Sequence, residues 1–189
     1  MVRIRLARPG QGSAVEALVA VALGGDGEVA LAGAFAAAIE AGGGRIRLPY
    51  GEGLVLVACP ADDSGQVLGM LYVCPPIRLI DDCADLGRQV QQRLTEAVAE
   101  VELLAVAERA RRRGIGGMLL DAARDTLRGR SCKLLYVKVR HDDKPVLGWY
   151  RRRGYQLLPQ GQPIVIRVAG RPVGFADGTD GYRVLVKPI

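Results

Sequence analysis

Three arginines and three glycines fall within seven residues of this 189-residue chain, where positions 111–117 read Arg-Arg-Arg-Gly-Ile-Gly-Gly. A strand-like run at 100–106 precedes them, and a helix-like run at 118–124 follows. Glycines let backbone N–H groups approach an anion, and the first N–H groups of a helix lack intrahelical partners and carry partial positive charge. Guanidinium groups add full charge and forked donors. The pattern predicts a phosphate-binding loop, and the alternative is a glycine-containing loop with solvated arginines.

The spacing of these glycines departs from two common phosphate loops. The dinucleotide fingerprint G-x-G-x-x-G, counted from Gly114, requires a third glycine where this chain has Leu119. The nucleoside-triphosphate loop G-x-x-x-x-G-K-[ST] is absent from the sequence. The predicted loop therefore belongs to neither class.

A second motif lies downstream, at 149–155, and reads Trp-Tyr-Arg-Arg-Arg-Gly-Tyr. Together the two motifs resemble the GNAT superfamily of coenzyme-A-dependent N-acyltransferases. The pyrophosphate loop of that family reads R/Q-x-x-G-x-G/A, and Arg111, Gly114 and Gly116 occupy its defining positions. A helix of the family ends in aromatic–Tyr–x–x–x–Gly–Phe/Tyr, which the second motif matches. Independently of the resemblance, a glycine at position 154 is typical of the residue that follows the end of a helix.

The resemblance covers roughly residues 1–158 and is tightest over 99–158. It implies an α/β chain with the GNAT fold, in which a mixed, mostly antiparallel sheet of six to seven strands has helices on both faces. It also implies a single acyltransferase domain at 1–189, with insertions at about 75–98 and 159–181 that flank the acceptor entrance.

The implied reaction transfers an acetyl or other acyl group from acyl-CoA to an amine of a small molecule. The attacking amine must lose a proton, the oxyanion must be stabilised, and the leaving thiolate must be protonated. Residues 99–106, followed after four residues by Arg111, match without a gap the strand that carries the general base in histone-acetylating members. The match places Glu100 at the base position, with Glu102 on the same strand face as a second candidate. The alternative for both is an ordinary solvated carboxylate at a strand end.

Tyr150 matches the tyrosine that protonates the departing thiolate in this family, and its alternative role is that of a core aromatic. Asp143 stands where the family commonly has an asparagine that contacts the cofactor, and His141, the only histidine, is predicted to be a loop residue. The residues that the resemblance implies for cofactor binding are Leu104 through its backbone N–H, Ala105, Val106, Arg111, Arg112, Arg113, Gly114, Ile115, Gly116, Gly117, Asp143 and Tyr150.

Composition agrees with one intracellular enzyme domain. Hydrophobic residues make up 49% of the chain, but no apolar run reaches the roughly 18 residues of a membrane span. The N-terminus alternates like a strand and lacks the apolar core of a signal peptide. Four cysteines without C-x-x-C spacing and a single histidine predict reduced, mostly buried thiols and no metal site. We expect a cytoplasmic protein that uses acetyl-CoA, or another acyl-CoA, as co-substrate.

The net charge is +6, and arginines cluster at the two motifs, with four at 109–113 and three at 151–153. Coenzyme A would use part of this charge, and the rest is either a solvated basic face or faces an acidic partner or an RNA backbone. Three functions therefore stay open: transfer to a small-molecule amine, a GNAT-fold reaction on or with an aminoacyl-tRNA, and a non-catalytic acyl-CoA-binding module. The oligomeric state, including a homodimer, also stays open.

Apolar periodicity and turn residues predict the elements that position these motifs. Ser13 and Glu16 form a capping box pattern for a helix that ends near Ala22. Apolar residues at spacings of three and four predict one amphipathic helix within 75–98. The other predicted helices are 28–41, 116–128 and 144–153, and the predicted strands are 2–6, 54–59, 67–73, 99–106, 133–140, 155–158, 164–168 and 182–186, with a hairpin turn at 61–65.

Overall fold

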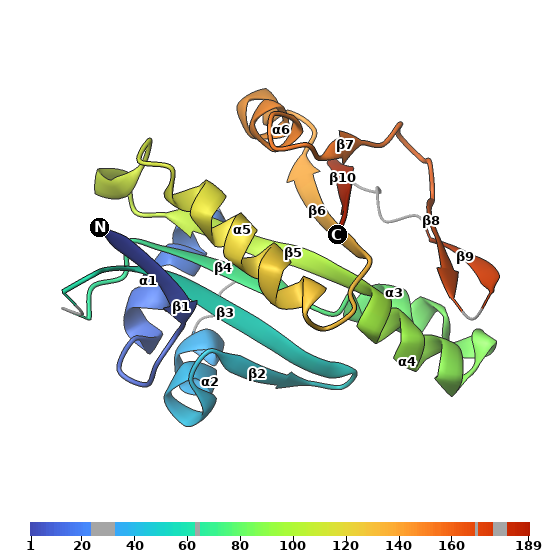
Figure 1. The fold of residues 1–189 in the computed structure, drawn as a ribbon, viewed down its shortest axis with the longest axis horizontal. Helices are drawn as coiled ribbons and strands as arrows, with labels where there is room; N and C mark the ends of the chain where they lie inside the picture. The colour runs from blue at the N-terminus through green and yellow to red at the C-terminus, as the bar shows by residue number, and fades with distance from the viewer. Residues whose placement is uncertain (24–32, 63–64, 169, 176–180) are drawn as a thin grey trace. The chain divides into compact units, whose positions relative to one another are not determined.

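The computed structural model describes residues 1–23, 33–62, 65–168, 170–175 and 181–189 (Figure 1). The chain divides into two compact units that we describe separately. The first unit contains Met1–Leu48, Glu52–Val73 and Glu102–Asp125. The second contains Pro49–Gly51, Cys74–Val101 and Thr126–Ile189. Strand β5 (Val98–Val106) contributes its first four residues to the second unit and the remainder to the first.

The first unit contains an antiparallel ladder of β1 (Val2–Leu6), β3 (Gly51–Pro60) and β4 (Gly69–Cys74), followed in strand order by the later part of β5. β2 (Arg45–Leu48) also pairs with β3. Residues 53–59 of β3 are buried without interruption. Continuous burial is typical of a strand that is covered on both faces, and it explains the unbroken apolar run at 54–59.

Helices cover opposite faces of β4. Neighbouring strand residues point to opposite faces, so positions 69 and 72, three residues apart, face opposite ways. At Tyr72 the ring makes an edge-to-face contact with Phe35 of α2 (Ala34–Gly42), at 4.9 Å between centroids. A Cβ added at Gly69 would lie 3.1 Å from Ile115 and 3.3 Å from Leu119 of α5 (Ile115–Arg128). The predicted arrangement, with helices on both faces, is therefore present in this unit.

Two glutamates cap the first two helices reciprocally. The N-cap residue of α1 (Gly12–Ala22), Gln11, makes no capping hydrogen bond with its side chain, and Glu16 accepts hydrogen bonds from the N–H groups of Gly33 and Ala36 at the start of α2. Glu40 of α2 in turn accepts from the N–H groups of Gly10 and Gly12, at 2.8 and 3.1 Å. The predicted capping box was wrong, because Glu16 caps the neighbouring helix and not its own.

The start predicted for the second helix, 28–32, lies outside the described residues, as do two residues of the predicted hairpin turn. The predicted hairpin itself is confirmed, because β3 and β4 pair antiparallel on either side of that turn.

The second unit contains the mixed part of the sheet. The first residues of β5 pair parallel with β6 (Leu134–Arg140), which pairs antiparallel with β10 (Tyr182–Pro188). β10 also pairs antiparallel with the short β7 (Gln156–Leu157). The predicted α/β class with a mixed, mostly antiparallel sheet is confirmed, with eight strands in the main sheet of the described chain instead of six to seven.

Residues 75–98 do not form the single predicted helix. They form α3 (Ile77–Asp82), a short 3₁₀ turn η2 (Ala84–Leu86) and α4 (Arg88–Ala97). The break is at Gly87, whose φ of 89° and ψ of 158° belong to a region that essentially only glycine occupies. Of the four apolar positions that produced the helical pattern, Leu79 and Cys83 belong to one buried cluster with Tyr136 and Val90 packs against it, whereas Leu86 is exposed.

The C-terminal region of the second unit adds a strand that the sequence did not predict. β8 (Ile164–Val168) pairs antiparallel with β9 (Arg171–Phe175), and Gly170, with φ of 79°, lies between them. A proline and a glycine inside β9 hide it from a periodicity search. α6 (Lys144–Arg151) begins where predicted and ends two residues earlier. No helix in the described ranges has the length and apolar character to cross a membrane.

Candidate functional site

The predicted phosphate loop lies in the first unit, between β5 and α5. A 3₁₀ turn, η3 (Glu108–Ala110), follows the strand, and the chain then passes through left-handed conformations at Arg112 (φ 60°) and Gly114 (φ 77°). Arg111, immediately before them, is extended, with φ of −62° and ψ of 161°. A Cβ at Gly114 would meet no atom within 4 Å, so the backbone conformation and not crowding favours glycine there.

The loop presents exposed cationic groups beside a helix N-terminus. Arg111, Arg112 and Arg113 are all exposed. The first backbone hydrogen bond of α5 runs from the Met118 N–H to the Gly114 carbonyl, at 3.1 Å, so the preceding N–H groups in the first turn have no intrahelical acceptor. Arg111 also donates from Nε to the Val106 carbonyl at 3.2 Å, which ties the loop to the end of β5. Free N–H groups, guanidinium groups and the helix dipole together suit a pyrophosphate.

The position of this helix N-terminus is fixed by close packing on β4. Ile115 and Leu119 are 1% and 0% exposed, and both face Gly69. A Cβ at Gly69 would also come within 3.0 Å of the Ala105 carbonyl oxygen. Glycine at 69 therefore lets α5 approach the sheet closely, a requirement that the sequence alone did not reveal.

The predicted base Glu100 lies in the second unit, where it is 8% exposed. The Tyr136 hydroxyl donates to its Oε2 at 2.7 Å, and the Lys138 ammonium lies 3.0 Å from its Oε1. Both partners come from β6, which pairs in parallel with β5 so that Glu100 is opposite Tyr136. Each oxygen of the carboxylate thus has a donor, and the ammonium stabilises the anionic form.

Tyr136 and Lys138 are functional candidates that sequence reasoning missed. They are two residues apart and so share a strand face, which the sequence does show. What the sequence lacks is the register of β6 against β5. The second carboxylate candidate, Glu102, differs from Glu100 because it is exposed. Glu102 thus lies at the surface, while Glu100 belongs to a buried network.

The second motif forms α6 in the second unit. Asp143 is its N-cap residue and accepts from the Val146 N–H at 3.1 Å, which accounts for an aspartate at this position independently of any cofactor. His141 lies in the turn before it, with Nδ1 2.8 Å from the Gly181 carbonyl oxygen. As predicted for a loop residue, His141 is exposed. Gly154, with φ of 79°, follows the helix end as expected.

Tyr150 is 3% exposed and lies between two aromatic rings. Trp149 and Tyr155 pack edge-to-face against it, at centroid distances of 4.8 and 5.1 Å. Burial raises the pKa of Tyr150 well above its ordinary value, and Tyr155 adds to the rise while Arg153 opposes it. The phenol is therefore held in its protonated form, the form that a general acid requires.

Part of the arginine charge is used inside the protein. The Arg153 guanidinium stacks on the Trp149 ring at 3.8 Å, while Lys187 donates to the Arg153 carbonyl. In the first unit, Arg124 lies within 3.3 Å of Asp121 and 3.6 Å of Asp125. These contacts reduce the number of cations that an external polyanion would meet.

Each unit brings together one set of the predicted residues. The first contains Leu104, Ala105, Val106, Glu102 and the loop at 111–117, and the second contains Glu100, Asp143 and Tyr150. Within the described residues, no group of three or more His, Cys, Asp or Glu side chains is placed to hold a metal ion.

A model of the acetyltransferase (GNAT) family matches residues 34–155, which is more than half of the chain and includes both motifs. The chain belongs to the GNAT acetyltransferase family. The matched range includes the strand with Glu100, the loop of arginines and glycines, and the aromatic residues of α6. A comparison with curated proteins found no match.

Solved structures of GNAT acetyltransferases share the fold at low sequence identity. A GNAT family acetyltransferase from Elizabethkingia anophelis with acetyl-CoA bound is 15% identical, with a TM-score of 0.61 over 100% of this chain and 98% of that one. NAA60 of Arabidopsis thaliana in complex with acetyl-CoA is 16% identical, with a TM-score of 0.63 over 100% and 99%. An IAA acetyltransferase from Bacillus cereus is 17% identical, with a TM-score of 0.60 over the whole of both chains.

Proposed function

We propose that this GNAT protein is an acyl-CoA-dependent N-acyltransferase that transfers an acetyl group to an amine of a small molecule. The observation that carries the proposal is the exposed loop at 111–114, with its left-handed turns at Arg112 and Gly114, leading into the N-terminus of α5. Family membership supports acetyl transfer, and two of the similar structures hold acetyl-CoA.

Binding of the acyl donor would use residues of the first unit. Arg111, Arg112, Arg113 and the N–H groups of Gly114–Gly117 would bind the pyrophosphate of acetyl-CoA. The edge of β5 at Leu104, Ala105 and Val106 would pair with pantetheine, with the Leu104 N–H polarising the thioester carbonyl. Arg111 already bonds the Val106 carbonyl, so this arginine would both contact phosphate and fix the strand end.

The chemical step needs a proton acceptor and a proton donor. The amine nitrogen would bond to the carbonyl carbon, its proton would pass to a carboxylate directly or through water, and the C–S bond would break as the sulfur takes a proton. Glu100 is our candidate acceptor, since it is the buried carboxylate at the family position, and Tyr150 is our candidate donor. The Tyr136 and Lys138 contacts would orient Glu100, and Asp143 would position α6 as its cap.

Charge distribution favours a small-molecule amine over an RNA-linked substrate. Arg124 and Arg153 are engaged within the protein, and aromatic residues make up only 5% of the chain, which leaves few rings to stack on bases. The alternative on or with an aminoacyl-tRNA is tested below by its salt dependence.

The proposed activity is tested by incubating the protein with radiolabelled acetyl-CoA and a panel of small amines. Release of free CoA thiol and the label on the amine are measured together. We expect amine-dependent thiol release with matching label transfer. If acetyl-CoA binds but no amine accelerates thiol release, the chain is an acyl-CoA-binding module and the proposal is wrong.

A further inference from the structure

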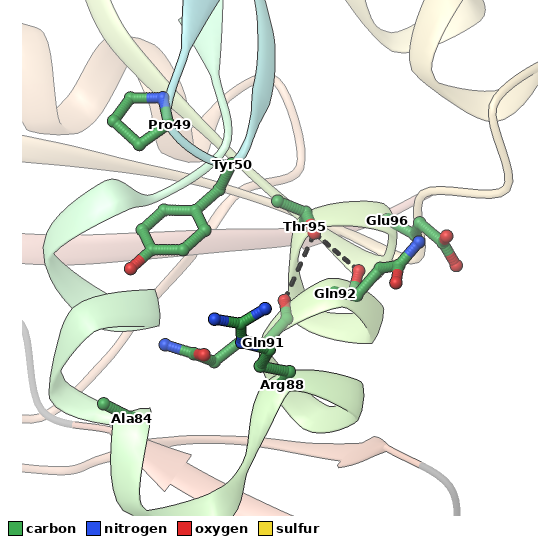
Figure 2. A pocket seen from close by; sticks show the side chains of 8 residues that line it. All are labelled: Pro49, Tyr50, Ala84, Arg88, Gln91, Gln92, Thr95 and Glu96. Carbon is green, nitrogen blue, oxygen red and sulfur yellow. Dashed lines mark hydrogen bonds between the residues drawn. The ribbon is translucent and has the colours of Figure 1, made fainter.

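A pocket of about 720 Å³ lies within the second unit, on the face of α4 that meets the turn before β3 (Figure 2). Its volume is within the range of small-molecule sites. Pro49 and Tyr50 form one wall, and residues of α4 with Ala84 form the other. The second wall belongs to the region between β4 and β5, where the sequence predicts an insertion.

Hydrogen bonds within the protein hold side chains of both walls. The Tyr50 hydroxyl donates to Asp81, and the Gln91 amide donates to the Ile80 carbonyl at 3.0 Å. The Thr95 hydroxyl donates back to the carbonyls of its own helix. The hydrogen-bond donors of these side chains are therefore already paired within the protein, and these side chains shape the pocket.

Two charged groups in the lining stand apart from this pattern. Among the residues that the structure describes, neither the Arg88 nor the Glu96 side chain has a hydrogen bond or an ion pair, although the side chains of Arg140, Arg124 and Arg45 all do. Figure 2 shows the Arg88 guanidinium on the Tyr50 side of the pocket and the Glu96 carboxylate at the far end, beyond Thr95 and Gln92. The pocket therefore offers a cation at one end and an anion at the other.

The separation of the two groups sets the length of a matching ligand. Arg88 and Glu96 are eight residues apart on one helix, which at 1.5 Å per residue is about 12 Å along its axis. A single α-amino acid carries its two charges much closer than that. An extended tripeptide spans about 10 Å, since each extended residue covers roughly 3.3–3.6 Å.

We propose that this pocket binds the acceptor, and that the acceptor is a short peptide-like amine whose carboxylate pairs with Arg88 and whose amine end lies toward Glu96. This inference rests on the proposed function. Glu96 precedes Glu100 by four residues, so their Cα atoms are at most about 15 Å apart along the chain. The amine end of the ligand is thus the end nearer to the candidate base.

Triglycine, triglycinamide and N-acetyltriglycine are the probes, titrated against the protein without acyl-CoA and followed by NMR chemical shifts. We expect triglycine to bind best, because only it carries both charges. Arg88→Gln should weaken triglycine about tenfold or more and remove the preference for triglycine over triglycinamide. Glu96→Gln should remove the preference for triglycine over N-acetyltriglycine. Arg93→Gln, at an exposed arginine of the same helix outside the pocket, is the control and should change nothing.

Equal binding of the three probes, or the same affinity in the Arg88→Gln and control proteins, overturns the proposal. Acetylation of triglycine with a KM raised by Arg88→Gln and an unchanged affinity for acetyl-CoA supports it further. Failure of acetyl-CoA to bind would refute the proposed function alone, because the probe titrations contain no acyl-CoA. Specific binding of triglycine without its acetylation in the presence of bound acetyl-CoA would refute the acceptor role of the pocket.

Discussion

Tyr150 is buried among aromatic neighbours, and its raised pKa keeps on the hydroxyl the proton that a departing thiolate would take. Tyr150→Phe keeps the ring in place and removes only the hydroxyl. We expect kcat to fall about 10²–10³-fold, with acetyl-CoA affinity unchanged, as for loss of a general acid. Because the pKa of Tyr150 is raised, its proton stays bound as pH rises through the range where a free phenol ionises, so ionisation of Tyr150 should not lower kcat between about pH 9 and 11. An unchanged kcat in Tyr150→Phe would show that the hydroxyl has only a structural role.

The Glu100 network makes a separate prediction about stability. In Lys138→Met the buried carboxylate loses its ammonium partner and keeps the Tyr136 hydroxyl. We expect the free energy of unfolding to fall by about 1–3 kcal/mol, since a buried polar group is left without its partner. Urea denaturation measures this, with Lys133→Met at an exposed position as the control. Adding Glu100→Gln should restore part of the loss, and equal stability of the two lysine variants would contradict the network.

Between elements, the close approach of α5 to β4 at Gly69 fixes the position of the N-terminus of α5, into which the loop leads. Gly69→Val would push on Ile115 and Leu119, so we expect a loss of about 1–3 kcal/mol of stability together with weaker acetyl-CoA binding. Gly69→Ala should have the same effects to a smaller degree. Gly42→Ala, where a Cβ meets nothing within 4 Å, is the control. Thermal unfolding and calorimetry check both effects, and full acetyl-CoA affinity in Gly69→Val would separate the loop from this packing.

The sequence predicted best the elements whose apolar periodicity and turn residues lie within the element itself. The strand, loop and helix from 98 to 128 carry their own periodicity and glycines, and their bounds differ from the prediction by one residue at most. Long-range contacts carried no such signal. The register that places Tyr136 and Lys138 against Glu100, the capping of α2 by Glu16 and the approach at Gly69 each depend on a partner far along the chain. At Gly87 the local signal was present, but the apolar spacing across it suggested one helix.

For the molecule as a whole, the net charge of +6 leaves the RNA-linked alternative to be tested directly. An RNA partner would contact several phosphates, so its affinity should fall steeply with salt, with a log–log slope roughly proportional to the number of contacts. We expect no such binding of bulk tRNA in a gel shift between low and physiological salt. The control is charge reversal at Arg124, Arg128 and Arg130, which should leave the gel shift of tRNA unchanged if RNA is not a partner. Tight tRNA binding that this variant abolishes, with acetyl-CoA binding preserved, would favour the RNA-linked function.

A single domain over the whole chain, a cytoplasmic location and the oligomeric state stay predictions, while the family and the fold are established. The central claim is that the loop at 111–117 binds the pyrophosphate of an acyl-CoA. Calorimetric titration of acetyl-CoA into Gly116→Val tests it most directly, since a β-branched side chain there blocks the approach of the phosphates to the helix N-terminus. Met118→Val places the same side chain at an exposed position of the same helix and is the control. We predict binding at least about 100-fold weaker in Gly116→Val, which is about 2.7 kcal/mol, with unfolding unchanged and normal binding in Met118→Val. Undiminished acetyl-CoA binding by Gly116→Val would contradict the account.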